Sequence, residues 1–230
     1  MNSFTVQGSF LIEIFLARHG QTQWNKEFRF QGWKDKPLTK KGVLQAKKTA
    51  KFLENRKIDC IFCSDLPRAK ETAAFIIQKH PESSVEFVTE LRELSFGLLE
   101  GKTWEEAAEV VPDLFGTEAK NGFFIPHPRG ESFEQLRERV GEFLKKILKL
   151  HDKTILLVSH DGVARSILQN LFELDFEQRE MVCQPHEIVY SIKIFEDGKK
   201  SCSWTNIETG EQGKGFFLKP EGFGFKAKSK

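Results

Sequence analysis

The chain has 230 residues, of which 39% are hydrophobic and 30% charged, the balance of a soluble globular protein. This length predicts a single domain over residues 1–230, with a core from about 11 to 207. The formal net charge of +2 is too small to argue for a nucleic-acid or membrane partner. No apolar run is long enough to span a bilayer and no signal peptide is evident, so we expect a cytoplasmic protein.

The cysteines favour the same compartment. There are four, Cys60, Cys63, Cys183 and Cys202, and their spread does not suggest a disulfide framework. Cys60 and Cys63 have C-x-x-C spacing, but no second pair stands at zinc spacing. They fall in an expected strand, where odd spacing sends the two side chains to opposite faces. We therefore expect these two cysteines to be structural, and we expect no cofactor.

Apolar runs alternate with amphipathic stretches along the chain, which predicts an α/β fold with helices covering a sheet. In chain order, strands are expected at 10–17, 58–63, 85–88 and 154–159, followed by a hairpin of 188–195 and 201–207 around Asp197-Gly198. Helices are expected at 39–53, 66–78, 104–111, 132–147 and 162–171.

Capping residues indicate where three of these helices begin. Thr39 is the expected N-cap of the first, and Ser132 with Gln135 forms a capping-box pattern. Ser64 or Asp65 is the expected N-cap of the helix over 66–78, with Pro67 in its first turn. Residues 111–130 have no clear period and suggest an inserted, substrate-facing segment, while 211–230 form a tail of unclear structure.

Three expected strands end in polar residues of the same kind. In open α/β sheets, ligands bind in the crevice beyond the carboxyl ends of the strands. Singly, a histidine there could be structural and an arginine could be a surface charge. Together, two histidines and two arginines would converge on one edge; the three strand ends are Arg18-His19-Gly20, Ser64-Asp65-Leu66-Pro67-Arg68 and Ser159-His160-Asp161-Gly162.

Arg68 indicates what the edge would bind. A cation in the first turn of a helix opposes the helix dipole, unless an anion lies between them. Helix N-termini also bind phosphate through free N–H groups. Gly20 and Gly162 each follow a histidine closely, and a missing Cβ would let the backbone approach a ligand. The sequence thus predicts an oxyanion pocket, most plausibly for a phosphoryl group.

The two histidines suggest covalent chemistry. Among arginines and helix N-termini, an imidazole should resist a second positive charge, and a neutral imidazole can carry a phosphoryl group. The arginines and the other histidine would hold the phosphoryl oxygens. A departing alkoxide needs a proton from an acid, and the candidates are Glu90, Glu93 and Glu100.

At this point the sequence resembles the histidine phosphatase superfamily, which contains cofactor-dependent phosphoglycerate mutases and acid-type histidine phosphatases. The resemblance runs from about residue 11 to about 206 and is specific because several motifs occur in order. These are "ARHGQTQWN", "FQGWKDKPLTKKGVLQA", "CSDLPRAKETA", "LRELSFGLLEGKTWEE", "PRGESFEQLRERV" and "LLVSHDGVAR".

The resemblance implies an α/β three-layer sandwich, with a mostly parallel central sheet flanked by helices and no required metal. His19 would be the phosphoryl-accepting nucleophile and Glu93 the proton donor. The implied phosphate pocket comprises Arg18, Asn25, Gln31, Arg68, His160 and Gly162.

The acid-bearing motif resembles the phosphatase branch, which includes broad-specificity and α-ribazole phosphatases. We therefore expect a phosphomonoester hydrolase acting on a small phosphorylated metabolite. A cofactor-dependent phosphoglycerate mutase is the alternative, and a phospho-ligand binding module without turnover is a third hypothesis. The segment 111–130 would wall the leaving group, or its aromatic residues would form a satellite core; it contains Phe115, Lys120, Phe123, Phe124, His127 and Arg129. The oligomeric state, monomer or dimer, is left open.

Overall fold

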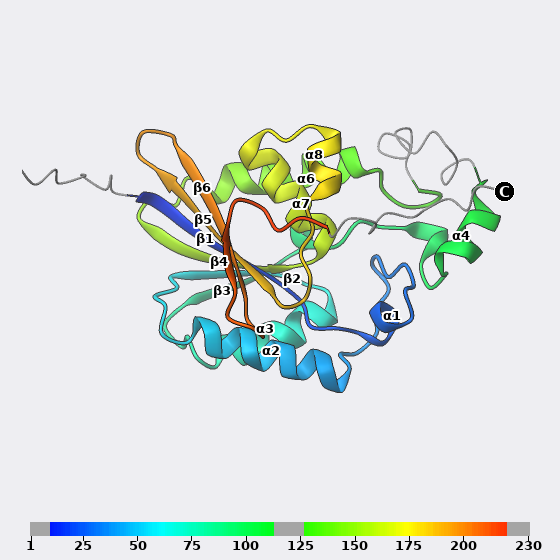
Figure 1. The fold of residues 1–230 in the computed structure, drawn as a ribbon, viewed down its shortest axis with the longest axis horizontal. Helices are drawn as coiled ribbons and strands as arrows, with labels where there is room; N and C mark the ends of the chain where they lie inside the picture. Colours follow the sequence, from blue (N-terminus) through cyan, green and yellow to red (C-terminus); the bar gives the residue numbers. More distant parts are fainter. Residues whose placement is uncertain (1–9, 113–126, 220–230) are drawn as a thin grey trace, which may run out of the picture.

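A computed structural model of the chain describes residues 10–112 and 127–219. They form a seven-stranded sheet with helices on both faces (Figure 1). The sheet order is β3-β2-β4-β1-β5-β6-β7. The first four strands in this order run parallel to one another, and β5, β6 and β7 each pair antiparallel with the strand before it. The strands are β1 (Phe10–Arg18), β2 (Cys60–Ser64), β3 (Ser84–Val88), β4 (Lys153–Ser159), β5 (Ile188–Phe195), β6 (Lys200–Asn206) and β7 (Gln212–Lys214).

Two helices cover one face of the sheet and two others cover the opposite face, which confirms the three-layer α/β architecture. In Figure 1, α2 (Lys40–Leu53) and α3 (Pro67–Ile77) lie below the sheet. Above it lie α6 (Phe133–Ile147) and α7 (Asp161–Phe172). Shorter helices are α1 (Gln23–Lys26), α4 (Trp104–Val110) and α8 (Phe176–Met181), with single 3₁₀ turns at Thr89–Leu91 and Gly97–Leu99.

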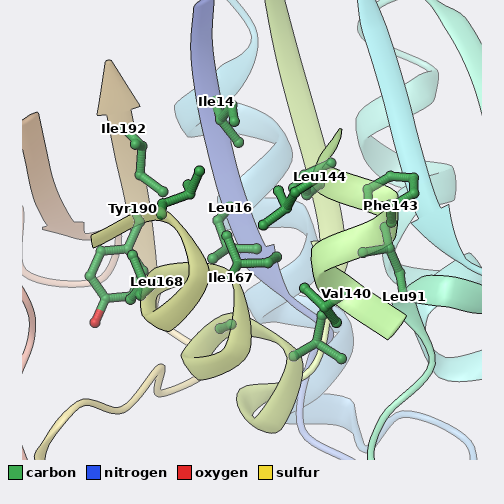
Figure 2. Packing of buried hydrophobic residues seen from close by; sticks show 14 of the residues in the cluster. Ile14, Leu16, Leu91, Val140, Phe143, Leu144, Ile167, Leu168, Tyr190 and Ile192 are labelled. Carbon is green, nitrogen blue, oxygen red and sulfur yellow. The ribbon is translucent and has the colours of Figure 1, made fainter. Parts of the chain in front are cut away.

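The core has two parts, one on each face of the sheet. Alternate residues of β1 point to opposite faces, so Ile14 and Leu16 pack with α6 and α7. Figure 2 shows this packing, in which Val140 and Leu144 of α6 lie beside the strand. Phe15 and Ala17 face the other way and join the cluster that includes residues of α2 and α3. Because it is buried on both faces, β1 is a rigid support for the residues that follow it.

The register between β1 and β4 brings the two histidine motifs together. Arg18 pairs with Ser159, and the backbone N–H of His19 donates to the Ser159 carbonyl at 3.0 Å. Both strands therefore end at the same level, and the next residue in each chain segment is a histidine. The predicted meeting of these strand ends at one edge is confirmed.

One expectation about local structure needs correction, and another concerns residues that the structure does not describe. The N-cap of α3 is Leu66, without a side-chain cap, whereas Ser64 or Asp65 was expected. Ser64 is instead engaged with His160, as described below. Of the segment 111–130, Phe115, Lys120, Phe123 and Phe124 lie outside the described residues.

His127, at the described end of that segment, packs as a core residue. Its ring lies 5.1 Å from the ring of Phe96 and 5.9 Å from that of Phe133, and its Nδ1 lies 2.7 Å from the Glu131 carbonyl. The three phenylalanines on which the satellite-core alternative depends lie outside the described residues, so that alternative and the leaving-group wall stay predictions. Further along, part of the expected tail is ordered as β7, and Val182 forms a β-bridge with Leu218.

Candidate active site

A cavity of about 990 Å³ opens where β1 ends. Six of the eight residues that the resemblance assigned to the site contribute to its lining: Arg18, His19, Asn25, Gln31, Arg68 and Glu93. The other two, His160 and Gly162, lie directly behind lining residues and contact His19 and Glu93 respectively. Neither Glu90 nor Glu100, the other acid candidates, is among the described lining residues.

His19 is held as a neutral ring with a defined tautomer. Burial lowers its pKa well below the usual value, and nearby Arg68, His160 and Arg18 lower it further. Its Nδ1 lies 2.8 Å from the Gly20 carbonyl, which can only accept, so the ring proton is on Nδ1. Nε2 therefore carries the lone pair, and the Nε–H of Arg68 points at it from 3.3 Å. A neutral imidazole nitrogen with a lone pair is a competent nucleophile.

Arg68 is almost completely buried and its guanidinium is fixed on three sides. It donates to the carbonyls of Gly32 at 2.7 Å and Lys34 at 3.1 Å, and it pairs with the carboxylate of Asp35 at 2.8 Å. Asp35 thus offsets the charge of Arg68, which sits unfavourably at the N-terminus of α3. Asp35 was not predicted as a site residue although it lies in a quoted motif, because its contact with Arg68 spans 33 residues of the chain.

His160 lies beside His19, with ring centroids 5.0 Å apart. Burial, with Arg68 and Arg18 nearby, lowers its pKa well below the usual value, so this ring is neutral too. The Ser64 hydroxyl lies 2.9 Å from His160 Nε2, and its oxygen also accepts from the Leu66 N–H at 3.3 Å. His160 Nδ1 is buried and has no hydrogen-bond partner among the described residues, so in the tautomer that carries the ring proton on Nδ1 this nitrogen is an unpaired donor. Such a donor suits a phosphoryl oxygen.

Glu93 has the properties of a proton donor. Burial raises the pKa of its carboxyl group, and the nearby Asp161 adds to that effect, while Arg18 and Arg68 act against it. Its Oε1 accepts from the Leu94 N–H at 2.8 Å, and its Oε2 faces the Gly162 N–H at 3.4 Å. A Cβ on residue 162 would lie 2.3 Å from the Glu93 carboxylate. In this structure Gly162 thus makes room for Glu93, whereas close approach to the ligand was expected.

Gly20 also has a different reason from the one expected. A Cβ there would lie 2.2 Å from the Gly42 carbonyl oxygen, and a Cβ on Gly42 would lie 2.1 Å from that of Gln21. The missing Cβ atoms let the segment after β1 pack backbone to backbone against the first turn of α2. This contact, together with the Gly20 N–H to Thr72 hydroxyl bond of 3.0 Å, positions the residues beside His19.

Asn25 and Gln31 line the cavity, and both are positioned there by hydrogen bonds with Thr22. The Thr22 backbone N–H and hydroxyl each lie 3.0 Å from Asn25 Oδ1, in the capping box of α1. The same hydroxyl lies 2.7 Å from Gln31 Oε1, and Gln31 Nε2 is buried with no partner in the described part of the chain. Gln31 therefore presents an N–H₂ group that could donate to a phosphoryl oxygen.

Three further residues at or beside the cavity, His186, Asp161 and Gln184, were not predicted as site residues. His186 Nδ1 lies 2.7 Å from the His19 carbonyl, and burial with Arg18 nearby lowers the pKa of its ring to about 3. Asp161 pairs with Arg165 at 2.5 Å and accepts the Gln184 N–H at 2.7 Å. Arg18 in turn donates to the Gln184 carbonyl at 3.0 Å. His186 and Gln184 lie just before a predicted strand, a place where the polar cluster could have been noticed.

The chemistry of the site depends on nitrogen donors and one acid. Within residues 10–112 and 127–219, no group of three or more His, Cys, Asp or Glu side chains could hold a metal ion. No helix in that part of the chain is long and apolar enough to cross a membrane.

An α/β protein with neutral imidazoles and arginines at one end of a cavity, and a buried carboxyl group in the lining of that cavity, offers the groups that phosphoryl transfer uses. The family is identified by sequence. The model of the histidine phosphatase superfamily (branch 1) matches residues 14–207, so the chain belongs to this superfamily.

Relatives in the family carry two kinds of activity in their names. A metal-independent phosphoserine phosphatase of Arabidopsis thaliana is 38% identical over 160 residues, covering 67% of this chain and 66% of that protein. A 2,3-bisphosphoglycerate-dependent phosphoglycerate mutase of Parvibaculum lavamentivorans is 30% identical, covering 72% and 82%. The crystal structure of the alpha-ribazole phosphatase from Shigella flexneri superposes with a TM-score of 0.73 at 25% identity, covering 80% of this chain and 91% of that one.

Proposed function

We propose that the protein is a metal-independent phosphomonoester hydrolase that acts through a phosphohistidine on a small phosphorylated metabolite. The observation that carries this proposal is the state of His19, a neutral ring with its Nε2 lone pair directed at the buried Arg68. A nucleophile and an anion-binding cation therefore share one point of the cavity. The phosphatase names among the relatives support the same reaction class.

In the first step, His19 Nε2 attacks phosphorus in line with the ester oxygen. An N–P bond forms, the P–O bond breaks, and the departing oxygen takes the proton of the Glu93 carboxylic acid. Arg18, Arg68 and His160 donate hydrogen bonds to the phosphoryl oxygens as charge redistributes. The products of this step are the free alcohol, phosphohistidine and the Glu93 carboxylate.

In the second step, water replaces the alcohol. The Glu93 carboxylate takes a proton from water as the water oxygen attacks phosphorus, and the N–P bond breaks. Inorganic phosphate leaves, His19 regains its lone pair, and Glu93 is again an acid. The same carboxyl group thus serves both half-reactions from one position.

The test is hydrolysis of p-nitrophenyl phosphate in excess EDTA. We expect turnover by the wild-type protein and a loss of more than about 10³-fold for His19→Ala, because the nucleophile is removed. The matched control is His151→Ala, which removes an exposed histidine and should keep full activity. Full activity of His19→Ala, or activity that disappears with EDTA, would contradict the mechanism.

A phosphoglycerate mutase is the second candidate, because relatives with that name match the same region. A mutase would return the phosphoryl group from His19 to substrate. Conversion of 3- to 2-phosphoglycerate, with a phosphohistidine that resists water, would favour it. Tight vanadate binding without turnover of any ester would favour the third hypothesis, a binding module.

We also infer that the protein works in a reducing compartment such as the cytoplasm. All four cysteines are free thiols, and burial raises the pKa of Cys183 to about 11. Since the thiolate is the reactive form, buried thiols of this kind are structural. The inferred partner is a small phosphorylated substrate.

A further inference from the structure

Phe28 is the most exposed large apolar residue of the described chain, at 84% relative exposure. It also has a positive φ of 54°, in the left-handed region. The other non-glycine residues with positive φ among those described are all polar: Arg129, Asp152 and Glu173. A bulky side chain in this conformation is uncommon and strained.

The turn that carries Phe28 is firmly held. The Phe28 N–H donates to the Asn25 carbonyl at 3.3 Å, and the Arg29 N–H donates to that of Trp24 at 2.9 Å. The Arg29 guanidinium then bridges to the Gly101 carbonyl at 2.8 Å and to Glu106 at 2.9 Å. The surrounding hydrogen bonds thus impose the unfavourable conformation on Phe28, and a ring is nevertheless kept exposed.

The exposed ring belongs to the lining of the catalytic cavity. Phe28 lines it together with Phe30, Phe96 and Trp104. The Phe30 ring contacts two of these rings: its centroid lies 4.9 Å from that of Phe96 and 5.8 Å from that of Trp104. The cavity therefore combines a charged end at Arg18 and Arg68 with an aromatic surface, to which Phe28 adds an accessible face. Ligand sites commonly pair apolar walls with a few placed polar groups.

We propose that Phe28 is a specificity-determining residue that packs against the alcohol portion of the substrate. This inference rests on the proposed function and deepens it. The preferred substrate class is then a phosphate monoester whose alcohol carries an apolar ring or chain. Burying the exposed Phe28 face against such a group stabilises the bound substrate. This stabilisation explains why backbone strain is maintained at this position.

The experiment compares benzyl phosphate with ethyl phosphate, which have the same phosphoryl end. For Phe28→Asn we expect the ratio of kcat/KM for benzyl over ethyl phosphate to fall about 10-fold, because an apolar contact is lost. Asparagine tolerates the left-handed conformation, so we also expect Tm to rise by about 2–4 °C. Phe28→Leu, which keeps an apolar side chain, should retain most of the preference.

The control is Leu44→Asn on α2, which alters a 59% exposed leucine that does not line the cavity. It should leave the ratio unchanged. An unchanged ratio in Phe28→Asn would overturn the proposal, as would a lower Tm with equal losses for both esters, the result expected if Phe28 served packing or contact between copies.

Binding separates this inference from the proposed function. If the wild-type protein hydrolysed neither ester, the phosphatase proposal would fail, but the affinities for benzylphosphonate and ethylphosphonate would still be measurable by calorimetry. A Phe28-dependent preference for benzylphosphonate would uphold the contact, and equal affinities would reject it.

Discussion

At the scale of single residues, Glu93 and His19, the proposed acid and the proposed nucleophile, have opposite shifts in pKa. Burial raises the pKa of Glu93, because the charged carboxylate is the disfavoured form. Burial lowers the pKa of His19, because there the protonated ring is the charged form. The two shifts favour the same combination of states, His19 as a free base and Glu93 as a protonated acid. That combination is what cleavage of an ester requires.

Glu93→Gln tests this assignment. For an alkyl phosphate we expect kcat/KM to fall by about 10²–10⁴, because the alkoxide loses its proton donor. p-Nitrophenolate leaves without a proton, so kcat/KM for p-nitrophenyl phosphate should fall much less in Glu93→Gln. In the wild-type protein, kcat/KM for the alkyl ester should decline as pH rises through the elevated pKa of Glu93. Measured pH profiles of both proteins decide the matter, since an identical decline in Glu93→Gln would show that another group titrates.

The residues of the site differ in how far sequence could predict them. His19, Arg68 and His160 follow predicted strands, so fold class alone brings them to one edge. Asp35 and His186 come from loops, and their contacts depend on loop paths that no local pattern encodes. The role of Gly162 was likewise missed, because it depends on where Glu93 lies across the cavity.

At the scale of elements, the junction of β1 with α2 sets the position of the nucleophile. Gly20 and Gly42 pack backbone to backbone, and the His19 carbonyl on the same segment is hydrogen-bonded to His186 Nδ1. Added atoms at this contact would have to displace either the strand end or the helix. Since both belong to the packed core, neither can move cheaply.

Gly20→Ala should therefore cost both stability and activity. The new Cβ would lie 2.2 Å from the Gly42 oxygen, so we expect a loss of about 1–3 kcal/mol in the free energy of unfolding. A clear loss in kcat should follow, because His19 would shift. Gly198→Ala is the control: it lies in the β5–β6 hairpin at φ 81° with open space around it, and it should reduce stability without affecting kcat. Wild-type stability and kcat in Gly20→Ala would disprove the role of this contact.

Elements with strong local signals were predictable, and those that depend on tertiary contacts were not. Ser132 and Gln135 form the expected capping box of α6, and Thr39 caps α2. The N-cap of α3 was mispredicted because Ser64 also serves His160, a competition that is invisible in a local window. The short helix α8 was missed although Asp175 and Gln178 form a capping box, since only six residues follow the cap.

At the scale of the whole molecule, burial keeps most of the histidines neutral. His19, His80, His127, His160 and His186 all have a pKa lowered from the usual 6.5, with burial as the largest cause of each. In the unfolded chain the same rings would titrate near 6.5. Folding therefore expels protons from histidines at mildly acidic pH, and the fold as a whole responds to pH through them.

The sign of this linkage predicts acid sensitivity. Below pH 6.5 the unfolded chain binds more protons than the folded one. The histidine contribution to the free energy of unfolding is therefore largest above pH 6.5 and decreases as the pH falls. Each strongly shifted histidine contributes at most about 1.4 kcal/mol per pH unit. The lowered carboxylate pKa values act only at lower pH, near and below 4, so the window from about 6.5 to 4.5 belongs to the histidines. The raised pKa of Glu93 works in the opposite direction, but it is one group against several.

Urea unfolding at pH 7.5, 6.5 and 5.5 measures the effect. We expect little change between the first two values and a loss of several kcal/mol at 5.5, of order 1.4 kcal/mol for each strongly shifted ring. The matched control for loss of a histidine is His151→Gln, which replaces an exposed side chain and should leave the pH dependence intact. His186→Gln should reduce it by removing one ring whose pKa is lowered to about 3. Equal stability at 7.5 and 5.5 would mean that the buried rings accept protons in the folded protein, and His19 would then not be the free base on which the mechanism depends.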